Sequence, residues 1–326
     1  MKKSLLALAV AAALPAVALA QTNIVLNGSV DVSLESVNDD ANGGNGSDLR
    51  VSNGVWSGSR FAISGTEELG GGLKGIFNIE HRLSPDTGTV TDPDRFWFGQ
   101  SWVGLQGGFG AVRLGRQYTP IFRALAPGDV TGYSWYNNGA GLAGTPNRFD
   151  NDVSWQSPSL GGFTIHAAYA AGEDATAPID NKLGDAYGIA GVGAFGPINV
   201  GLGYHSIDAG GAPGVDDTTQ LAASLGAKFG NFGVGLSAAQ NEVNSNKRKA
   251  FFGSVSAGIG AGTVYLTLKK DDQGTDLDDT GLGLTYSHGL SKRTFVYASL
   301  GYNKVEQAIG DDQKPRKIAL GVRHFF

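Results

Sequence analysis

The strongest constraint on the fold is an alternation of apolar and polar residues with a period of two. From Ile24 to Leu34, apolar residues and one glycine fall on one face, and from Asn27 to Glu35 polar residues fall on the other. The same pattern recurs over 60–64, 73–82 and 263–269. A period of two places successive side chains on opposite faces of a β-strand, so the sequence predicts an all-β fold.

Two kinds of connection alternate along the chain. Short glycine-rich turns are expected at 70–72, 107–108, 161–162, 196–197, 230–231, 260–262 and 289–291. Longer polar loops are expected at 37–55, 84–94, 119–147, 172–182, 207–217, 242–248, 272–278 and 306–314. These fifteen connections join sixteen strands, with both termini on the side of the short turns. An even strand number, with tight turns at one end and longer loops at the other, is typical of a bacterial outer-membrane β-barrel.

The main alternative is a soluble β-sandwich or a β-helix adhesin. A sandwich makes the inner faces of both sheets apolar and usually fits a smaller domain. Here polar faces recur regularly along the whole chain, and no break divides it into domains. We therefore predict one 16-stranded antiparallel transmembrane β-barrel over residues 21–326, with apolar side chains facing lipid and polar side chains facing the lumen.

The N-terminus has the form of a secretory signal peptide. Lys2 and Lys3 precede an apolar run that starts at Leu5, and small residues end at Ala20. This pattern predicts a signal peptide over residues 1–20 and a mature chain that begins at Gln21. The apolar run is shorter than the roughly 20 residues that a membrane-spanning helix needs.

The C-terminus supports the barrel independently. Apolar residues alternate back from a terminal phenylalanine, at Ile318, Leu320, Val322 and Phe326. A barrel has no sheet edge in the lipid only if its last strand pairs with its first, so we expect this segment to pair with the strand near Ile24.

Composition and motifs argue against other classes of function. The formal net charge of −5 falls by two, to −7, when Lys2 and Lys3 are removed, which argues against a nucleic-acid partner, and no cysteine is present to form disulfides. Residues 70–75 match G-x-G-x-x-G but lie between two strands, so they predict a hairpin turn and no dinucleotide site. The five histidines are scattered, and the nearest nucleophile–base pair, Ser287–His288, lies at a turn. We predict no enzyme activity, cofactor or metal site.

Four stretches resemble the general porins of β-proteobacteria, a family that includes the neisserial porins. They are SRFAISGTEELGGGLKGIFNIE (59–80), SWVGLQGGFGAVRLGRQYTPIF (101–122), RFDNDVSWQSPSLGGF (148–163) and GVRHFF (321–326). The resemblance implies a sixteen-stranded barrel in the outer membrane of a Gram-negative bacterium, usually a homotrimer, whose third external loop folds into the lumen. It also implies that the strand ending at Phe326 is recognised by the outer-membrane assembly machinery.

The segment 119–147 is the longest connection in the chain. Loops of this length without their own core are usually functional or disordered. Folded into a barrel of this width, the segment would narrow the passage to the size of small hydrophilic solutes, so we expect it to be a constriction loop. The alternative is an exposed, mobile loop.

Charged residues within strands should face the lumen, because a charge facing lipid at mid-depth costs about 2–4 kcal/mol. The candidate constriction residues are Arg60, Lys74, Glu80, Arg82, Arg95, Arg113, Asp129 and Arg148. In the porin family, arginines at the positions of Arg60 and Arg148 line the constriction. A third family arginine falls at Gly99, where this chain departs from the pattern, and either Arg95 or Arg82 could replace it.

The charges near the expected constriction predict a mild preference for anions. Between residues 119 and 147 the only acid is Asp129 and the only base is Arg123, so arginines of the wall outnumber the carboxylates opposite. Alternatively, the arginines pair with strand carboxylates and leave the pore unselective. Three aromatic residues, Tyr133, Trp135 and Tyr136, leave open a channel specific for sugars or organic acids. An adhesin or receptor role of the external loops also remains an alternative.

Overall fold

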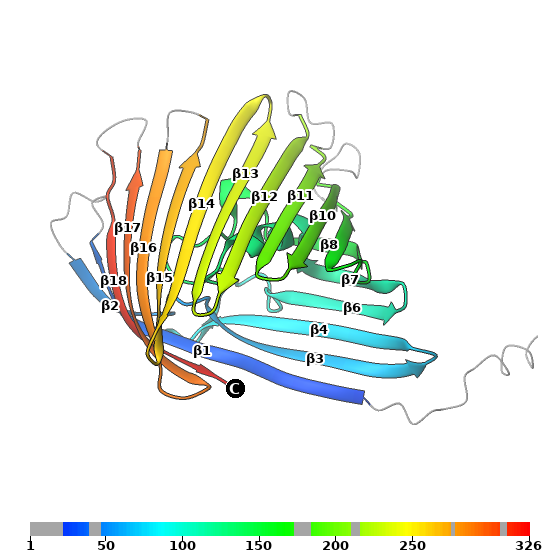
Figure 1. Cartoon of the computed structure of the whole chain (residues 1–326), viewed down its shortest axis with the longest axis horizontal. Helices are drawn as coiled ribbons and strands as arrows, with labels where there is room; N and C mark the ends of the chain where they lie inside the picture. Colours follow the sequence, from blue (N-terminus) through cyan, green and yellow to red (C-terminus); the bar gives the residue numbers. More distant parts are fainter. Residues whose placement is uncertain (1–21, 39–46, 173–183, 210–215, 275–277, 307–311) are drawn as a thin grey trace, which may run out of the picture.

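The structure is a computed structural model that describes residues 22–38, 47–172, 184–209, 216–274, 278–306 and 312–326. The expected signal peptide lies outside the described residues, as do parts of five of the expected long loops. A single antiparallel sheet closes on itself into a barrel (Figure 1). Within the described residues, no helix has the length and apolar character needed to cross a bilayer.

Eighteen strand segments make up the sheet. In chain order they are β1 (Thr22–Asn38), β2 (Ser47–Ser52), β3 (Ser59–Gly70), β4 (Leu73–Ser84), β5 (Thr89–Val90), β6 (Gln100–Gly107), β7 (Gly110–Tyr118), β8 (Arg148–Gln156), β9 (Phe163–Ala170), β10 (Ala186–Phe195), β11 (Ile198–Ile207), β12 (Thr218–Phe229), β13 (Phe232–Val243), β14 (Asn246–Ile259), β15 (Gly262–Asp272), β16 (Asp278–Gly289), β17 (Thr294–Val305) and β18 (Arg316–Phe325).

The eighteen segments form sixteen strands of the barrel wall. β2 and β3 pair with successive parts of β1, and β5 and β6 pair with successive parts of β4, so each pair of segments is one interrupted wall strand. The predicted 16-stranded antiparallel barrel is thereby confirmed.

The closing seam joins β1 to β18, as expected. The pairing runs from Ser29 opposite Phe325 to Asn38 opposite Arg316. Along its other edge β1 pairs with β3, where Ile24 lies opposite Gly65. The first strand extends beyond the end of β18, and alternation alone does not predict where along a strand its partner ends.

Two connections differ from their predicted lengths. The expected loop 242–248 is a tight turn, since Val243 pairs with Asn246 and only two residues lie between them. Asn244 and Ser245 both have positive φ angles, 49° and 63°. A two-residue turn of this kind favours asparagine and closes a hairpin, so the polar run was misinterpreted as a loop. The expected turn 161–162 is conversely part of a longer connection over 157–162.

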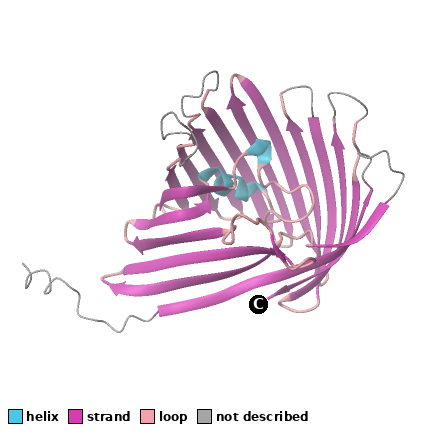
Figure 2. Ribbon diagram, turned by 180° about the vertical axis from the view of Figure 1, so that it is seen from behind, coloured by secondary structure: helices cyan, strands magenta, loops and turns pink. Residues whose placement is uncertain are grey.

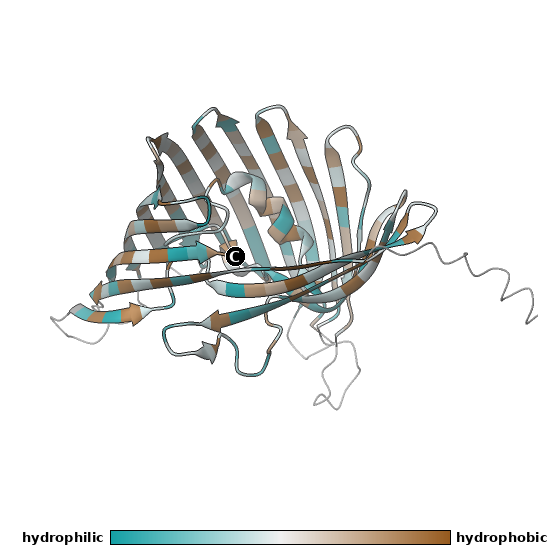
Figure 3. Ribbon diagram, turned by 90° about the horizontal axis from the view of Figure 1, so that it is seen from below, coloured by the Kyte–Doolittle hydropathy of each residue, from teal (hydrophilic) through white to brown (hydrophobic). Residues whose placement is uncertain are grey.

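The two faces of the wall differ as predicted, and Figure 3 shows hydrophobic and hydrophilic residues following one another along the strands. On β18, the side chains of Ile318, Leu320 and Val322 are exposed, whereas Ala319 and Arg323, at the alternate positions, are buried. Along the other strands the exposed positions are mostly leucine, valine and aromatic residues, and the buried ones are mostly small or polar. This inverted pattern suits a barrel whose outer face contacts lipid.

The segment 119–147 packs against the buried face of the wall. It contains α2 (Pro120–Leu125), η2 (Ala126–Gly128) and η3 (Leu142–Gly144). Apolar side chains of the segment form a cluster with small residues and one phenylalanine of the wall: Ile121, Leu125, Leu142, Ala143, Ala222, Ala239, Ala250 and Phe252. Figure 2 shows these helices on the concave side of the sheet.

Candidate constriction site

Three arginines from separate wall strands meet beside the segment 119–147. Arg60 of β3, Arg82 of β4 and Arg148 of β8 line one cavity of about 420 Å³. Phe122 and Tyr133 of the segment line the same cavity from the other side. The side chains share one face because Arg60 and Arg82 are cross-strand partners on neighbouring strands. The structure thus brings together three of the eight predicted site residues in one cavity.

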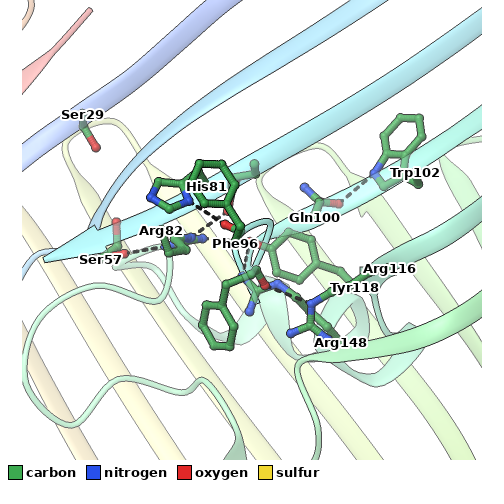
Figure 4. A network of polar contacts seen from close by, with 12 residues as sticks. Ser29, Ser57, His81, Arg82, Phe96, Gln100, Trp102, Arg116, Tyr118 and Arg148 are labelled. Carbon is green, nitrogen blue, oxygen red and sulfur yellow. Dashed lines mark hydrogen bonds and ion pairs between the residues drawn. The ribbon is translucent and has the colours of Figure 1, made fainter. Parts of the chain in front are cut away.

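Arg82 is held by three hydrogen bonds, and Figure 4 shows its bond to Ser57. Its Nε donates to Oε1 of Glu80 at 2.7 Å, and its Nη1 donates to the carbonyl oxygen of Ser57 at 2.9 Å. Its Nη2 donates to the hydroxyl of Tyr118 at 3.3 Å. Both side chains of the Arg82–Glu80 ion pair are largely buried, so Glu80 offsets most of the charge of Arg82 toward the cavity.

Arg60 and Arg148 carry the uncompensated charge. Arg148 donates from Nη2 to the hydroxyl of Tyr118 at 3.1 Å, and its guanidinium lies 4.6 Å from the centre of that ring. Across the described part of the chain, neither arginine lies within ion-pair distance of a carboxylate; the acids on this part of the wall pair with other arginines. Two guanidinium groups with free donors therefore border the cavity.

A stack of aromatic rings faces these arginines, and sequence reasoning missed two of its members. The rings of Tyr118 and Phe122 lie 4.3 Å apart and nearly parallel, and Phe122 and Tyr133 are also 4.3 Å apart. The stack forms because Thr119 caps α2, with its hydroxyl accepting a hydrogen bond from the backbone N–H of Phe122. A Thr-Pro pair directly after a strand is a helix-start signal that could have indicated this arrangement.

The three aromatic residues proposed as a stacking track separate in the structure. Tyr133 joins the stack on Phe122, and Trp135 is buried against Trp56 with ring centres 4.5 Å apart. Tyr136 donates its hydroxyl to Glu35. Because each ring has a different partner, they do not form one continuous surface for a sugar.

Gly99 explains how this site differs from the family pattern. A side chain at this position would overlap the carboxylate of Glu80, which occupies the space next to it. Arg95 does not fill that place, since its Nη1 lies 3.1 Å from Oδ2 of Asp150, which Arg116 also contacts. The absence of a third arginine thus leaves room for the Glu80–Arg82 pair.

Lys74 and Arg113 lie outside the cavity. Lys74 follows a short turn and pairs with Glu68 at 2.6 Å. Arg113 donates to Gln156 at 3.1 Å and lies 5.1 Å from the ring of Trp102. It is also near Arg123 of α2, whose pKa burial lowers to about 10. Arg113 and Arg123 form a second basic region, separate from the cavity.

Asp129 does not face the arginines. Its carboxylate accepts hydrogen bonds from the backbone N–H of Thr131 at 2.8 Å and of Gly139 at 2.9 Å, and from the hydroxyl of Thr131. Burial raises the pKa of this carboxyl group. Asp129 therefore stabilises the backbone of its own loop, and no loop carboxylate opposes the arginines within the described residues.

A bulge changes which residues of β8 face inward. The register between β7 and β8 shifts near Asn151, whose φ is 51°. Strict alternation counted back from Val153 places Phe149 on the outer face, but Phe149 is buried, with its ring 4.9 Å from that of His205. Strict alternation fails here because the bulge inserts an extra residue between Phe149 and Val153, so that Phe149 is buried while Arg148, the first residue of β8, still lines the cavity. Within the described ranges, no three metal-ligating side chains gather into a group.

Comparisons with known proteins agree with this geometry. The chain matches the family model described as Gram-negative porin over residues 7–308. It is 34% identical over 359 aligned residues to Outer membrane porin protein 32 of Delftia acidovorans, and 29% identical over 389 to an outer membrane porin protein of Bordetella pertussis; both alignments cover 100% of each chain. A solved structure, described as "Anion-selective porin from Comamonas acidovorans", is similar with a TM-score of 0.84 and 27% identity, covering 94% of this chain and 100% of that one.

Proposed function

This chain belongs to the Gram-negative porin family, and from that premise we propose that it forms a water-filled channel for passive diffusion of small hydrophilic solutes and ions, with a mild preference for anions. It is an outer-membrane protein, and its family and fold are those of channels, not enzymes. The observation that carries the anion preference is the pair of unpaired guanidinium groups, Arg60 and Arg148, at one cavity.

The electrostatic energy of two unpaired arginines is large enough for a mild preference for anions. Tenfold selectivity requires a difference of only about 1.4 kcal/mol between the free energies of an anion and a cation in the channel. A unit charge about 5 Å from an ion in water contributes about 0.8 kcal/mol before screening by salt. Two such charges are sufficient, and the similar solved porin from Comamonas acidovorans, which is described as anion-selective, is consistent with this sign.

We assign the narrowing of the channel to the segment 119–147. Phe122 of α2 and Tyr133 line one side of the cavity, and Tyr118 of β7 connects these rings to Arg82 and Arg148 on the wall. Ions then pass beside loop rings that carry no charge and a wall that carries a positive one.

Liposome swelling tests this function against a substrate-specific channel. A general porin should admit chemically unrelated neutral sugars at rates that fall smoothly with their size. Rates that saturate for one sugar or one organic acid, with other solutes of equal size excluded, would instead support a specific channel. Folded protein without channel activity in any such assay would turn attention to an adhesin or receptor role of the external loops.

We further propose that the chain assembles as a homotrimer. The rings of Phe61, Phe96 and Trp97 gather around His81 beside β3 and β4. His81 is itself buried and hydrogen-bonded to the carbonyl oxygen of Phe96, whereas the ring of Phe96 is more than half exposed and offers an apolar surface to a neighbouring copy of the chain. Insertion into a planar bilayer should then produce conductance steps in groups of three; single, independent steps in every membrane would contradict a trimer.

The remaining partners follow from the same family and fold. The exposed leucines and valines of the outer wall are proposed to contact outer-membrane lipid. We propose that residues 1–20 are removed as a signal peptide and that the assembly machinery recognises the strand ending at Phe326.

Glu80→Gln should increase the anion preference. The substitution removes the negative charge that offsets Arg82 while leaving an oxygen to accept its hydrogen bond. The chloride-to-potassium permeability ratio should rise about threefold, the value expected for one partly screened charge near the pore. Reversal potentials in a salt gradient measure the ratio. Glu68→Gln, at a distant turn, is the matched control, and equal ratios for Glu80→Gln and the wild type would contradict the role of Glu80.

A further inference from the structure

A second segment leaves the barrel wall beside the constriction. Residues 53–58 connect β2 to β3, and β1 pairs with β2 as far as Ser33 and with β3 as far as Ser29. The residues of β1 between Ser29 and Ser33 therefore lie opposite the longer segment 53–58, which bends away from the wall. Gly54 and Gly58, with φ angles of 71° and 74°, make the two bends.

Asp31 of β1 holds this segment. Its Oδ2 accepts a hydrogen bond from the backbone N–H of Trp56 at 2.9 Å, and its Oδ1 accepts one from the hydroxyl of Tyr297 at 2.8 Å. That hydroxyl in turn accepts a hydrogen bond from the backbone N–H of Val55 at 3.1 Å. Asp31 is fully buried. Both carboxylate oxygens are thus engaged in fixing the segment to β1 and β17.

Two arginines bind Ser57, the residue that follows Trp56. Arg323 of β18 donates from Nη1 to the hydroxyl of Ser57 at 2.8 Å, and its guanidinium lies 5.1 Å from the ring of Trp56. Arg82 donates to the carbonyl oxygen of Ser57 (Figure 4). The segment is therefore connected directly to an arginine of the constriction.

The segment also holds the constriction loop. The backbone N–H of Trp135 lies 3.0 Å from the carbonyl oxygens of both Val55 and Trp56, and the rings of Trp56 and Trp135 pack with centres 4.5 Å apart. Around this contact, three non-glycine residues of the loop have positive φ angles: Tyr133 (58°), Trp135 (71°) and Asn137 (55°). Such conformations persist only where surrounding contacts enforce them.

We propose that Asp31 and Trp56 are positioning residues for the constriction: they clamp the strained part of the loop against segment 53–58 and thereby keep the channel in its main conducting state. Loss of the clamp lets residues 133–137 relax into other conformations within the lumen, and the channel then changes repeatedly to lower conductance levels. This inference rests on the proposed channel function and concerns the stability of its open state.

Single-channel recording of Trp56→Ala tests the clamp. Transitions to lower conductance levels at a fixed voltage should become about tenfold more frequent, as expected for the loss of an aromatic pair. Trp56→Phe keeps a ring and should restore most of the stability of the open state. Trp155→Ala is the matched control, because Trp155 is partly exposed on the outer face, away from the loop. A wild-type transition frequency in Trp56→Ala overturns the proposal.

If Trp56→Ala yields no folded barrel, the isosteric variant Asp31→Asn tests the clamp in its place. An amide has one acceptor oxygen in place of two, so one of the two hydrogen bonds is lost. The same rise in transition frequency supports the clamp, and an unchanged frequency overturns it.

A covalent lock provides a reversible test in the Trp56→Ala background. The chain has no cysteine, and a Cβ at Gly281 would lie 3.0 Å from Cβ of Asn137, near the range of about 3.5–4.5 Å found in disulfides. Oxidised Asn137→Cys/Gly281→Cys should return the transition frequency to the wild-type value, and reduction should raise it again. A disulfide that forms without changing the frequency overturns the proposal. The reversal potential from the same recordings reports ion selectivity, so failure of the channel function is distinguished from failure of the clamp.

Discussion

Replacing Arg60 and Arg148 together by glutamine should abolish the chloride preference of the channel. These are the two guanidinium groups at the cavity that lack a carboxylate partner, and the loop opposite presents none. Each charge contributes about 0.8 kcal/mol to an ion about 5 Å away in water, so removing both should reduce the chloride-to-potassium permeability ratio about tenfold. Reversal potentials in a potassium chloride gradient measure this ratio.

A matched control separates this local effect from a change in net charge. Lys74→Gln combined with Arg95→Gln also removes two positive charges, but both side chains are paired with acids outside the cavity. That variant should keep the wild-type ratio to within about twofold, because both ion pairs lie outside the cavity and are exposed to solvent, where salt screens their charges. Equal shifts in the two double variants would contradict the assignment of selectivity to Arg60 and Arg148.

Gly201→Val should displace the constriction loop from the wall. Gly201 of β11 faces α2, and a Cβ there would overlap the carbonyl oxygen of Ala124. Overpacking of this kind costs about 1–3 kcal/mol, which shifts the equilibrium toward an undocked loop by about fivefold or more. The single-channel conductance should increase and become noisier, because α2 no longer occupies its place in the lumen.

Gly253→Val is the control for this prediction. A Cβ at Gly253 meets only a methyl carbon of Leu236, at 3.6 Å, which is an ordinary contact. This variant should fold and conduct like the wild type, and both variants should be checked for heat-modifiable migration on a gel. Wild-type conductance of folded Gly201→Val would contradict the docking of α2 on β11.

Local sequence patterns predict much of the wall because the physics of each strand is local. Side chains alternate between lipid and lumen, so Arg60, Glu80 and Arg82 could be placed on one face from spacing alone, and cross-strand pairing confirms that placement. The number of strands followed from the turns. Local patterns do not report an inserted residue, and this is why alternation places Phe149 on the wrong face next to the bulge at Asn151.

The details of the site depend on contacts between distant segments. The sequence shows that residue 99 is a glycine, but it does not show that the carboxylate of Glu80 lies beside it. Composition identifies Asp129 as the one acid of the loop, but its hydrogen bonds with Thr131 and Gly139 determine where it points. Segment 53–58 was expected to belong largely to a loop and the next strand, and only the tertiary contacts of Trp56 indicate a role.

The reversal potential of the purified wild-type protein in a planar bilayer, under a tenfold gradient of potassium chloride, is the most direct test of the central claim. The unpaired charges of Arg60 and Arg148 predict stepwise conductance and a potential whose sign shows that chloride is more permeant than potassium. A potential of zero or of the opposite sign, from folded and conducting protein, would contradict an anion-selective constriction built on these two arginines.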